Sequence, residues 1–114
     1  MLFVEYPKCS TCRKARKYLE DKGVEFESRH IVENNPTADE LREWIRISGY
    51  PARKFFNTSG IKYREMGLKD RMDLMTDDEK IELLSTDGML VKRPILVDGD
   101  RIFVGFKEKE WVFD

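Results

Sequence analysis

The sequence predicts an α/β (α+β) fold with a four-stranded mixed sheet and flanking helices. Three observations predict it. A β-α-β pattern occupies residues 2–32, a β-hairpin pattern surrounds Asp98-Gly99, and the segment between them, about residues 37–88, carries only helical patterns. Strands joined by a helix pair in parallel with a right-handed crossover, whereas the strands of a hairpin pair antiparallel. The sheet is therefore mixed, and an all-helical insert separates its two halves.

The N-terminal β-α-β unit follows from local signals. An apolar run over residues 2–6 predicts a buried strand, which Pro7 ends. Helical spacing over residues 11–22 predicts a helix, with Gly23 as its C-cap. Partial alternation from Glu25 to Val32 then predicts the second strand.

The insert contains two strong helix starts. Thr37-Ala38-Asp39-Glu40 and Thr76-Asp77-Asp78-Glu79 both have the capping-box form, and we expect the helices that they open to end at Gly49 and Gly88. Between these helices, residues 50–75 indicate short helices interrupted by polar residues and glycine. Large aromatic side chains along the chain are expected in the core: Trp44, Phe55, Phe56 and Trp111.

The C-terminal part has the pattern of a hairpin. Ile95-Leu96-Val97 and Ile102-Phe103-Val104 flank the turn signal Asp98-Gly99. Residues 107–113 are expected to form a final short helix. This order of elements is the thioredoxin-like arrangement with a helical insert, and residues 1–114 are expected to form a single domain.

Composition excludes several classes of function. The 114 residues include 21 basic and 22 acidic residues, so the net charge of −1 argues against direct binding of nucleic acid. The chain has no apolar run long enough to span a membrane, and Glu5 follows the first apolar residues too closely for a signal peptide. We therefore expect a cytoplasmic protein, whose thiols are kept reduced.

Cys9-Ser10-Thr11-Cys12 is the segment richest in chemistry. It lies between the first predicted strand and the first predicted helix, where a Cys-x-x-Cys indicates a thiol–disulfide redox pair. Free backbone N–H groups and the positive end of the helix dipole favour the thiolate, which is the reactive form. Three residues of helical advance place both sulfurs on the same side, so Cys9 and Cys12 are predicted to form a reversible disulfide.

Three other interpretations of the two cysteines were considered. They are a structural disulfide, half of a zinc site that would need His30 and a second chain, and a pair of inert buried thiols. Structural zinc takes four ligands, which this chain does not offer, so no metal is predicted. The redox interpretation is preferred over all three.

The chain resembles the arsenate reductase (ArsC)/Spx family along essentially its whole length. Three segments carry the resemblance: Tyr6-Pro7-Lys8-Cys9-Ser10-Thr11-Cys12-Arg13-Lys14-Ala15, Arg93-Pro94-Ile95 and Val104-Gly105-Phe106. The resemblance implies that Cys9 is the nucleophile and that Pro94 is a cis-proline against the cysteine motif. Arg93, Ser10, Thr11 and Pro94 are then expected to bind the anion or substrate. It also implies glutathione, or a thioredoxin or glutaredoxin system, as electron donor, with no bound cofactor.

The sequence departs from the arsenate reductases of this family at three positions. Two of their three arginines fall near Asn57 and Val104, and a histidine before the cysteine is replaced by Glu5. A carboxylate close to Cys9 would raise its pKa. Arsenate reduction is therefore expected to be weak or absent, because an oxyanion needs several compensating donors.

The predicted function is a thiol–disulfide oxidoreductase in which Cys9 attacks and Cys12 resolves. Its partner would be a small thiol or a disulfide-containing protein. The alternative is a redox-sensing transcriptional regulator of the Spx type, which binds the C-terminal domain of the RNA polymerase α-subunit. The chain ends at Asp114 without the longer basic tail of those regulators, which favours the enzyme.

Overall fold

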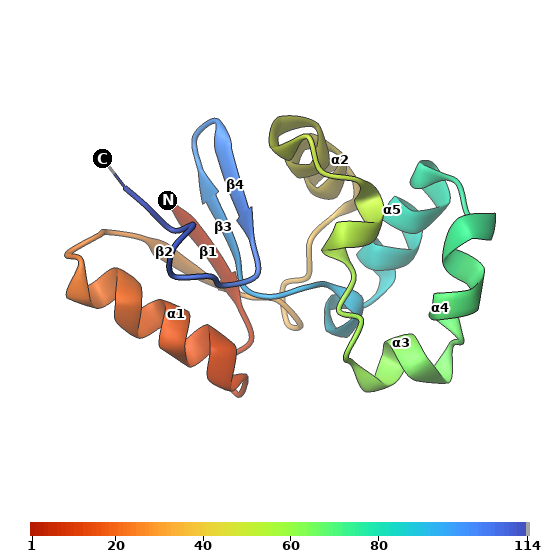
Figure 1. The fold of residues 1–114 in the computed structure, drawn as a ribbon, viewed down its shortest axis with the longest axis horizontal. Helices are drawn as coiled ribbons and strands as arrows, with labels where there is room; N and C mark the ends of the chain where they lie inside the picture. The colour runs from red at the N-terminus through yellow and green to blue at the C-terminus, as the bar shows by residue number, and fades with distance from the viewer. Residues whose placement is uncertain (114) are drawn as a thin grey trace.

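The computed structural model describes residues 1–113, and its strands form one mixed sheet (Figure 1). The strands are β1 (Leu2–Glu5), β2 (Glu27–His30), β3 (Ile95–Asp98) and β4 (Arg101–Val104), in the order β2-β1-β3-β4. β1 pairs in parallel with β2 and antiparallel with β3, and β3 pairs antiparallel with β4. The thioredoxin-like α+β fold predicted from the order of elements is confirmed.

The two faces of the sheet are covered by different parts of the chain. Helix α1 (Ser10–Asp21) and the C-terminal segment cover one face, where Phe3 and Leu96 pack with Leu19 and Trp111. The insert packs on the other face, which includes Val4. Consecutive residues of a strand point to opposite faces, so neighbours such as Phe3 and Val4 join different cores. β1 thus lies between two apolar layers, and its end carries the chain to the cysteine motif.

The insert consists of short helices. They are α2 (Ala38–Ser48), η1 (Ala52–Phe55), α3 (Ile61–Glu65), α4 (Leu68–Arg71), η2 (Met72–Leu74), α5 (Asp77–Thr86) and η3 (Gly88–Leu90). Both predicted capping boxes are present, with Glu40 N–H donating to Thr37 Oγ1 and Glu79 N–H to Thr76 Oγ1, each at 3.1 Å. The aromatic residues expected in the core are buried: Trp44, Phe55, Phe56 and Trp111.

The predicted C-terminal helix over residues 107–113 is wrong. This segment forms a turn and then continues without regular structure. Trp111 fixes its path, because the indole Nε1–H donates to the Gly105 carbonyl at 3.1 Å and the Tyr18 hydroxyl donates to the Trp111 carbonyl at 2.8 Å. Burial of one large aromatic side chain replaces the helix as the anchor of this end.

Two predicted boundaries also differ from the structure. β2 covers only Glu27–His30, half of the predicted range, because its register with β1 runs from Leu2 opposite Glu27 to Glu5 opposite His30. Helix α5 ends at Thr86, and Gly88 starts η3 instead of closing α5. Gly88 is buried against the end of β2: a Cβ atom there would lie 1.9 Å from the Ile31 carbonyl oxygen. Only glycine allows the insert to return this close to the sheet.

Candidate active site

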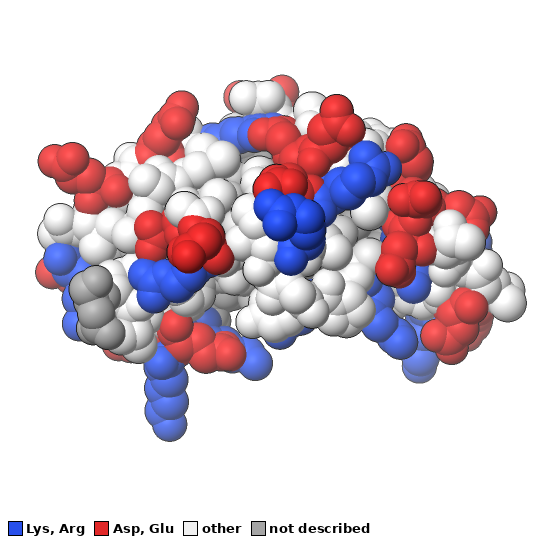
Figure 2. Space-filling view, turned by 90° about the horizontal axis from the view of Figure 1, so that it is seen from above, with Lys and Arg blue, Asp and Glu red and all other residues white. Residues whose placement is uncertain are grey.

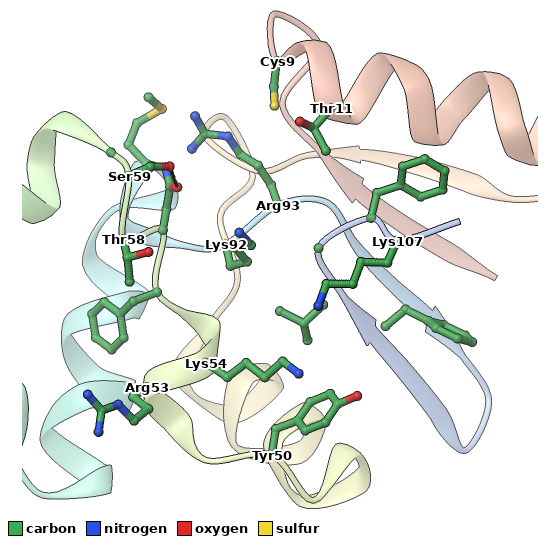
Figure 3. Close-up of a pocket in the computed structure, with 18 of the residues that line it drawn as sticks. Cys9, Thr11, Tyr50, Arg53, Lys54, Thr58, Ser59, Lys92, Arg93 and Lys107 are labelled. Carbon is green, nitrogen blue, oxygen red and sulfur yellow. Dashed lines mark hydrogen bonds between the residues drawn. The ribbon is translucent and has the colours of Figure 1, made fainter. Parts of the chain in front are cut away.

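A cleft of about 690 Å³ lies between the start of α1, the hairpin side of the sheet and the insert (Figure 3). Cys9 and Thr11 line it from α1, Arg93 from the segment before β3, and Asn57 from the insert. The four residues come from three separate parts of the chain. The fold therefore brings the predicted nucleophile to the junction between the sheet and the helical insert.

Cys9 is the N-cap residue of α1. Its backbone is extended, with φ −83° and ψ 125°, and its carbonyl accepts the first helical hydrogen bond, from Arg13 N–H at 3.1 Å. No side chain caps this helix start, and its first turn has no acidic residue. The free N–H groups of the first turn are thus directed towards the Cys9 sulfur and not towards a carboxylate or hydroxyl.

The surroundings of Cys9 favour its thiolate. Burial alone would raise the pKa of Cys9, but hydrogen bonds from the backbone and thiol of Cys12, from the Arg93 side chain and from the Thr11 backbone outweigh it. The pKa of Cys9 therefore lies below its ordinary value. Cys9 is half-buried and lines the cleft, so this thiolate is accessible to a ligand.

Cys12 has the opposite character. It is buried, and both cysteines are free thiols in this structure. Burial raises the pKa of Cys12 to about 12, with the negative charge of Cys9 adding to the effect, although the Tyr6 N–H group donates to the Cys12 sulfur at 3.5 Å. At neutral pH Cys12 is therefore a protonated thiol, which donates a hydrogen bond to Cys9.

Arg93 lies opposite Cys9. Figure 3 shows its side chain between the cysteine and the insert. The guanidinium carbon is 5.0 Å from the centroid of the Tyr6 ring, and Nη1 is buried without a hydrogen-bond partner among residues 1–113. A buried guanidinium nitrogen with no partner is costly unless an anion accepts from it. The following peptide bond, to the buried Pro94, is cis, as the resemblance implied.

Ser10 and Thr11 occupy different environments. Thr11 lines the cleft, and its N–H group helps to lower the pKa of Cys9. Ser10 begins α1 and is exposed, but it does not line the cleft. Of the two residues, Thr11 is the one placed to meet a ligand.

Glu5 has partners on two neighbouring elements. It is 1% exposed, and its carboxylate accepts hydrogen bonds from Ser28 and from Arg16, whose Nε lies 3.3 Å from Oε1. The Arg16 guanidinium also lies over the Phe3 and Phe26 rings. The carboxylate that the sequence places before the motif is therefore paired with Arg16 of α1 and Ser28 of β2.

The two uncharged residues that lie near the positions of arginines in the arsenate reductases line the cleft. Asn57 and Val104 both line it, and the Ser59 hydroxyl donates to Asn57 Oδ1 at 3.3 Å. Lys54 and Lys92 also line the cleft, and sequence reasoning missed both. Lys92 directly precedes Arg93, which was a usable signal, whereas nothing local to Lys54 indicates its place.

The His30 ring packs against Tyr6, the residue that follows β1. Its ring meets the Tyr6 ring edge-on, with centroids 5.7 Å apart, and Nδ1 accepts hydrogen bonds from Val32 N–H at 3.2 Å and Glu33 N–H at 3.1 Å. Within residues 1–113, no three His, Cys, Asp or Glu side chains are grouped to hold a metal ion. Nor does this part of the chain contain a helix long and apolar enough to cross a membrane.

The fold and the site together define a thioredoxin-like protein with a Cys-x-x-Cys motif at the start of its first helix. The model of the ArsC family matches residues 4–112, so the chain belongs to the ArsC family. The uncharacterized protein YusI of Bacillus subtilis (strain 168) is 50% identical over 111 residues, covering 97% of this chain and 94% of YusI. The regulatory protein MgsR of the same organism is 30% identical over 110 residues, covering 96% of this chain and 86% of MgsR.

Solved structures of related proteins share this fold. A crystal structure of an ArsC family related protein from Bacteroides fragilis superposes with a TM-score of 0.95 at 51% identity, over 96% of this chain and 92% of that one. A possible arsenate reductase from Streptococcus mutans UA159 superposes with a TM-score of 0.86 at 46% identity, over 93% and 90% of the two chains. The relatives thus include both a protein described as a reductase and a regulator.

Proposed function

We propose that this protein is a thiol–disulfide oxidoreductase in which Cys9 is the nucleophile and Cys12 the resolving cysteine. One observation carries the proposal: two cysteines three residues apart have opposite properties. The pKa of Cys9 is lowered at the mouth of a cleft, whereas burial raises the pKa of Cys12 to about 12. A structural disulfide or a pair of inert thiols does not require one cysteine with a lowered pKa and one with a raised pKa.

The proposed reaction has two exchange steps. The Cys9 thiolate attacks a disulfide R–S–S–R, forming a Cys9–S–S–R bond and releasing one R–S⁻, which takes a proton from water. Loss of the negative charge on Cys9 then removes one of the effects that raise the pKa of Cys12. Cys12 loses its proton and attacks Cys9, forming the Cys9–Cys12 disulfide and releasing the second R–S⁻. The substrate gains two electrons and the protein loses two.

The protein disulfide must be reduced before a second turnover. Two equivalents of an external thiol, such as glutathione, or one equivalent of a dithiol protein of the thioredoxin or glutaredoxin kind would return Cys9 and Cys12 to thiols. Cys9, which lies at the cleft, is the sulfur that such a donor reaches. Neither step requires a bound cofactor.

Arsenate is not the proposed substrate. Within residues 1–113, Arg93 is the basic side chain that hydrogen-bonds Cys9, and the resemblance to the arsenate reductases places two of their arginines near the uncharged Asn57 and Val104. An arsenate ion at Cys9 carries more than one negative charge, and the one guanidinium beside that sulfur does not compensate it.

The first test is a mass measurement. Mild oxidation of the reduced protein should give a mass loss of two hydrogens and protect both cysteines from alkylation. The variant Cys12→Ser should instead stop at the mixed disulfide with a small substrate such as 2-hydroxyethyl disulfide, visible as an added mass on Cys9. A protein that shows neither the mass loss nor the trapped adduct is not an oxidoreductase of this kind.

Turnover distinguishes the substrates. The protein should reduce 2-hydroxyethyl disulfide catalytically when it is supplied with glutathione, or with a thioredoxin or glutaredoxin system. With arsenate, the same donors should give little or no turnover. Arsenate turnover as fast as disulfide turnover would contradict the assignment of substrate while leaving the cysteine roles in place.

A second candidate function is a redox-sensing transcriptional regulator. The relative MgsR is a regulatory protein, and a global transcriptional regulator Spx 2 of Bacillus cereus is 28% identical over 90% of this chain. In this alternative the Cys9–Cys12 disulfide is a switch, and the partner is the C-terminal domain of the RNA polymerase α-subunit. Stoichiometric binding to that domain, dependent on the oxidation state and without disulfide turnover, would favour the regulator.

A further inference from the structure

The cleft has a charge that the whole chain lacks. The protein has 21 basic and 22 acidic residues, yet Glu110 is the one acidic residue among those that line the cleft within residues 1–113. The basic residues that line it are Arg53, Lys54, Lys62, Lys92, Arg93 and Lys107. On the face drawn in Figure 2, by contrast, positive and negative side chains are interspersed. The cleft is therefore an electropositive site on a nearly neutral protein.

Half of these positive charges already have acidic partners. Arg53 lies 3.7 Å from Asp73, Lys62 3.5 Å from Asp87, and Lys107 4.0 Å from Glu110. Lys54, Lys92 and Arg93 have no carboxylate within 4.0 Å among residues 1–113. Arg93 faces Cys9, so its charge belongs to the reacting end. Lys54 and Lys92 are left without a role in the chemistry.

The two lysines come from segments that are joined to each other. The Lys92 N–H group donates to the Phe55 carbonyl at 2.7 Å, and Phe55 is the neighbour of Lys54 in η1. A short antiparallel bridge between Phe56 and Val91 extends this contact. Two cationic side chains therefore enter the cleft from adjacent stretches of backbone, although they are 38 positions apart in the sequence.

Both side chains contact residues that line the cleft. The Lys54 ammonium lies 3.7 Å from the centroid of the Tyr50 ring, a cation–π contact that fixes its direction. The stem of Lys92 lies over Gly105, where a Cβ atom would be 3.1 Å from Lys92 Cε and where φ is +76°. Figure 3 shows Cys9 and Arg93 at one end of the cleft, Tyr50 and Lys54 at the other, and Lys92 between them.

The size of the cleft indicates a ligand larger than a simple oxyanion. A volume of about 690 Å³ is typical of clefts that bind small organic molecules. It corresponds to roughly twenty water molecules at about 30 Å³ each, far more than an ion of five heavy atoms displaces. Phe103, Phe106 and Val104 supply apolar wall between the charged groups.

We propose that Lys54 and Lys92 form a second anion-binding subsite, which selects a small disulfide substrate carrying a carboxylate or phosphate several bonds away from its sulfur. This inference rests on the proposed function. The substrate spans the cleft: its sulfur lies at Cys9, its apolar stem lies along the aromatic wall, and its distal anion lies between the two ammonium groups. The lysines accelerate formation of the Cys9 mixed disulfide and take no part in the bond exchange.

The test compares disulfides of different charge. In a Cys12→Ser background, which stops the reaction at the mixed disulfide, the rate of adduct formation is measured by intact mass. The substrates are neutral 2-hydroxyethyl disulfide, glutathione disulfide with its carboxylates, and coenzyme A disulfide with its phosphates. Lys54→Gln and Lys92→Gln should each slow the reaction of an anionic disulfide about three- to fivefold at low salt, with the effect shrinking as salt is added. The rate with the neutral disulfide should not change.

Lys69→Gln is the matched control, because Lys69 is an exposed lysine of α4 that does not line the cleft. It should leave all three rates unchanged. If the lysine variants lose more rate with glutathione disulfide, the distal anion is a carboxylate. If they lose more rate with coenzyme A disulfide, it is a phosphate. If Lys54→Gln and Lys92→Gln reacted with both anionic disulfides as fast as the Lys69→Gln control, the proposed subsite would be wrong. The proposed function would still stand in that case, provided that Cys9 reacts with the neutral disulfide. No adduct with any disulfide would overturn both.

Discussion

Helix α1 begins differently from the helices of the insert. α2 and α5 each start with a complete capping box. In each box the threonine hydroxyl accepts a hydrogen bond from the N–H group of the third helical residue, a glutamate, and the glutamate carboxylate accepts one from the N–H group of the threonine. Their first turns also carry acidic residues. α1 has no side-chain cap and no acidic residue in its first turn, and the residue at its N-cap is Cys9.

This difference in capping shows that the N–H groups at the start of α1, unlike those of α2 and α5, are free to interact with the Cys9 thiolate. A cap satisfies N–H groups and stabilises a helix by about 1 kcal/mol. The insert uses this stabilisation twice, at Thr37 and Thr76. At α1 the same N–H groups are kept for a thiolate, and an acidic residue there would compete for them and raise the pKa of Cys9.

The largest expected effect comes from replacing Cys9, the N-cap residue of α1, by a residue that caps helices. Cys9→Ser should abolish mixed-disulfide formation completely, because a serine hydroxyl does not replace a thiolate in exchange. Relative to Cys9→Ala, the same change should raise the free energy of unfolding by about 0.5–1 kcal/mol, because serine is among the preferred N-cap residues. Activity is followed by intact mass and stability by urea denaturation.

Cys9→Ala is the control for this variant. It removes the sulfur without supplying a cap, so it should lose all reactivity and gain no stability. If serine and alanine gave proteins of equal stability, the start of α1 would have no unmet capping capacity, and the comparison with α2 and α5 would fail.

The next largest effect is the difference in reactivity between the two cysteines. Burial raises the pKa of Cys12 to about 12, so only about one part in 10⁵ of its thiol is ionised at pH 7. Cys9, whose pKa is lowered, should be alkylated first. Its labelling rate should rise with pH and reach half of its plateau at a lower pH than for an ordinary cysteine, because the pKa of Cys9 is lowered. Rates of iodoacetamide labelling from pH 5 to 10, resolved by peptide mass, measure this, and preferential labelling of Cys12 would reverse the assignment of roles.

A smaller effect concerns Glu40, which caps α2 and pairs with Arg29 of β2 at 2.6 and 2.8 Å. The Arg29 guanidinium lowers the pKa of Glu40 to about 2. This carboxylate therefore contributes stability above its unfolded pKa of about 4.3, and the contribution is lost as pH falls towards 2. Glu40→Gln should cost about 1–2 kcal/mol at pH 7, less than the full shift because the side chain is partly exposed.

The measurement for Glu40 is urea denaturation of the native protein and the Glu40→Gln variant across pH 2 to 7. The difference in unfolding free energy between the two proteins should narrow below about pH 4.3 and nearly close at about pH 2. A difference that stays constant with pH would mean that the ion pair with Arg29 contributes nothing and that the loss comes from the cap alone.

The smallest effect tests the insert by itself. Thr76→Ala removes the acceptor of the Glu79 N–H hydrogen bond and should lower the free energy of unfolding by about 1 kcal/mol. The rate of Cys9 alkylation should stay unchanged, because α5 does not line the cleft. A change in the alkylation rate beyond about twofold would show that the caps of the insert and the reactive end are coupled.

Most of the fold could be predicted because its signals are local. The capping boxes, the Asp98-Gly99 turn and the Cys-x-x-Cys motif each act within a few residues of the chain. The C-terminal segment misled the prediction because Trp111 is held by Gly105 and Tyr18, contacts that no helical spacing reveals.

The candidate site divides in the same way. Cys9, Cys12 and Arg93 could be identified from motifs, and the structure places all three at one end of the cleft or beside it. Lys54 could not, because backbone contacts between distant segments, such as the hydrogen bond from Lys92 to Phe55 and the Phe56–Val91 bridge, bring η1 to the segment before β3. The pairing of distant segments decides which lysines line the same cleft. A single sequence does not show which distant segments pair.

Gly88 has a consequence for how this protein can vary. Its contact with the Ile31 carbonyl brings the exit of the insert against the end of β2, where the excursion from the sheet begins. The two ends of the insert are therefore in contact, and the hydrogen bond from Asn35 Nδ2 to the Ser85 carbonyl at 2.7 Å adds to this contact. Substitutions or changes of length inside the insert can then reshape the wall that carries Lys54 without moving the strand that leads to Cys9. For the proposed oxidoreductase, this architecture separates the residues that select the substrate from the cysteine that reacts.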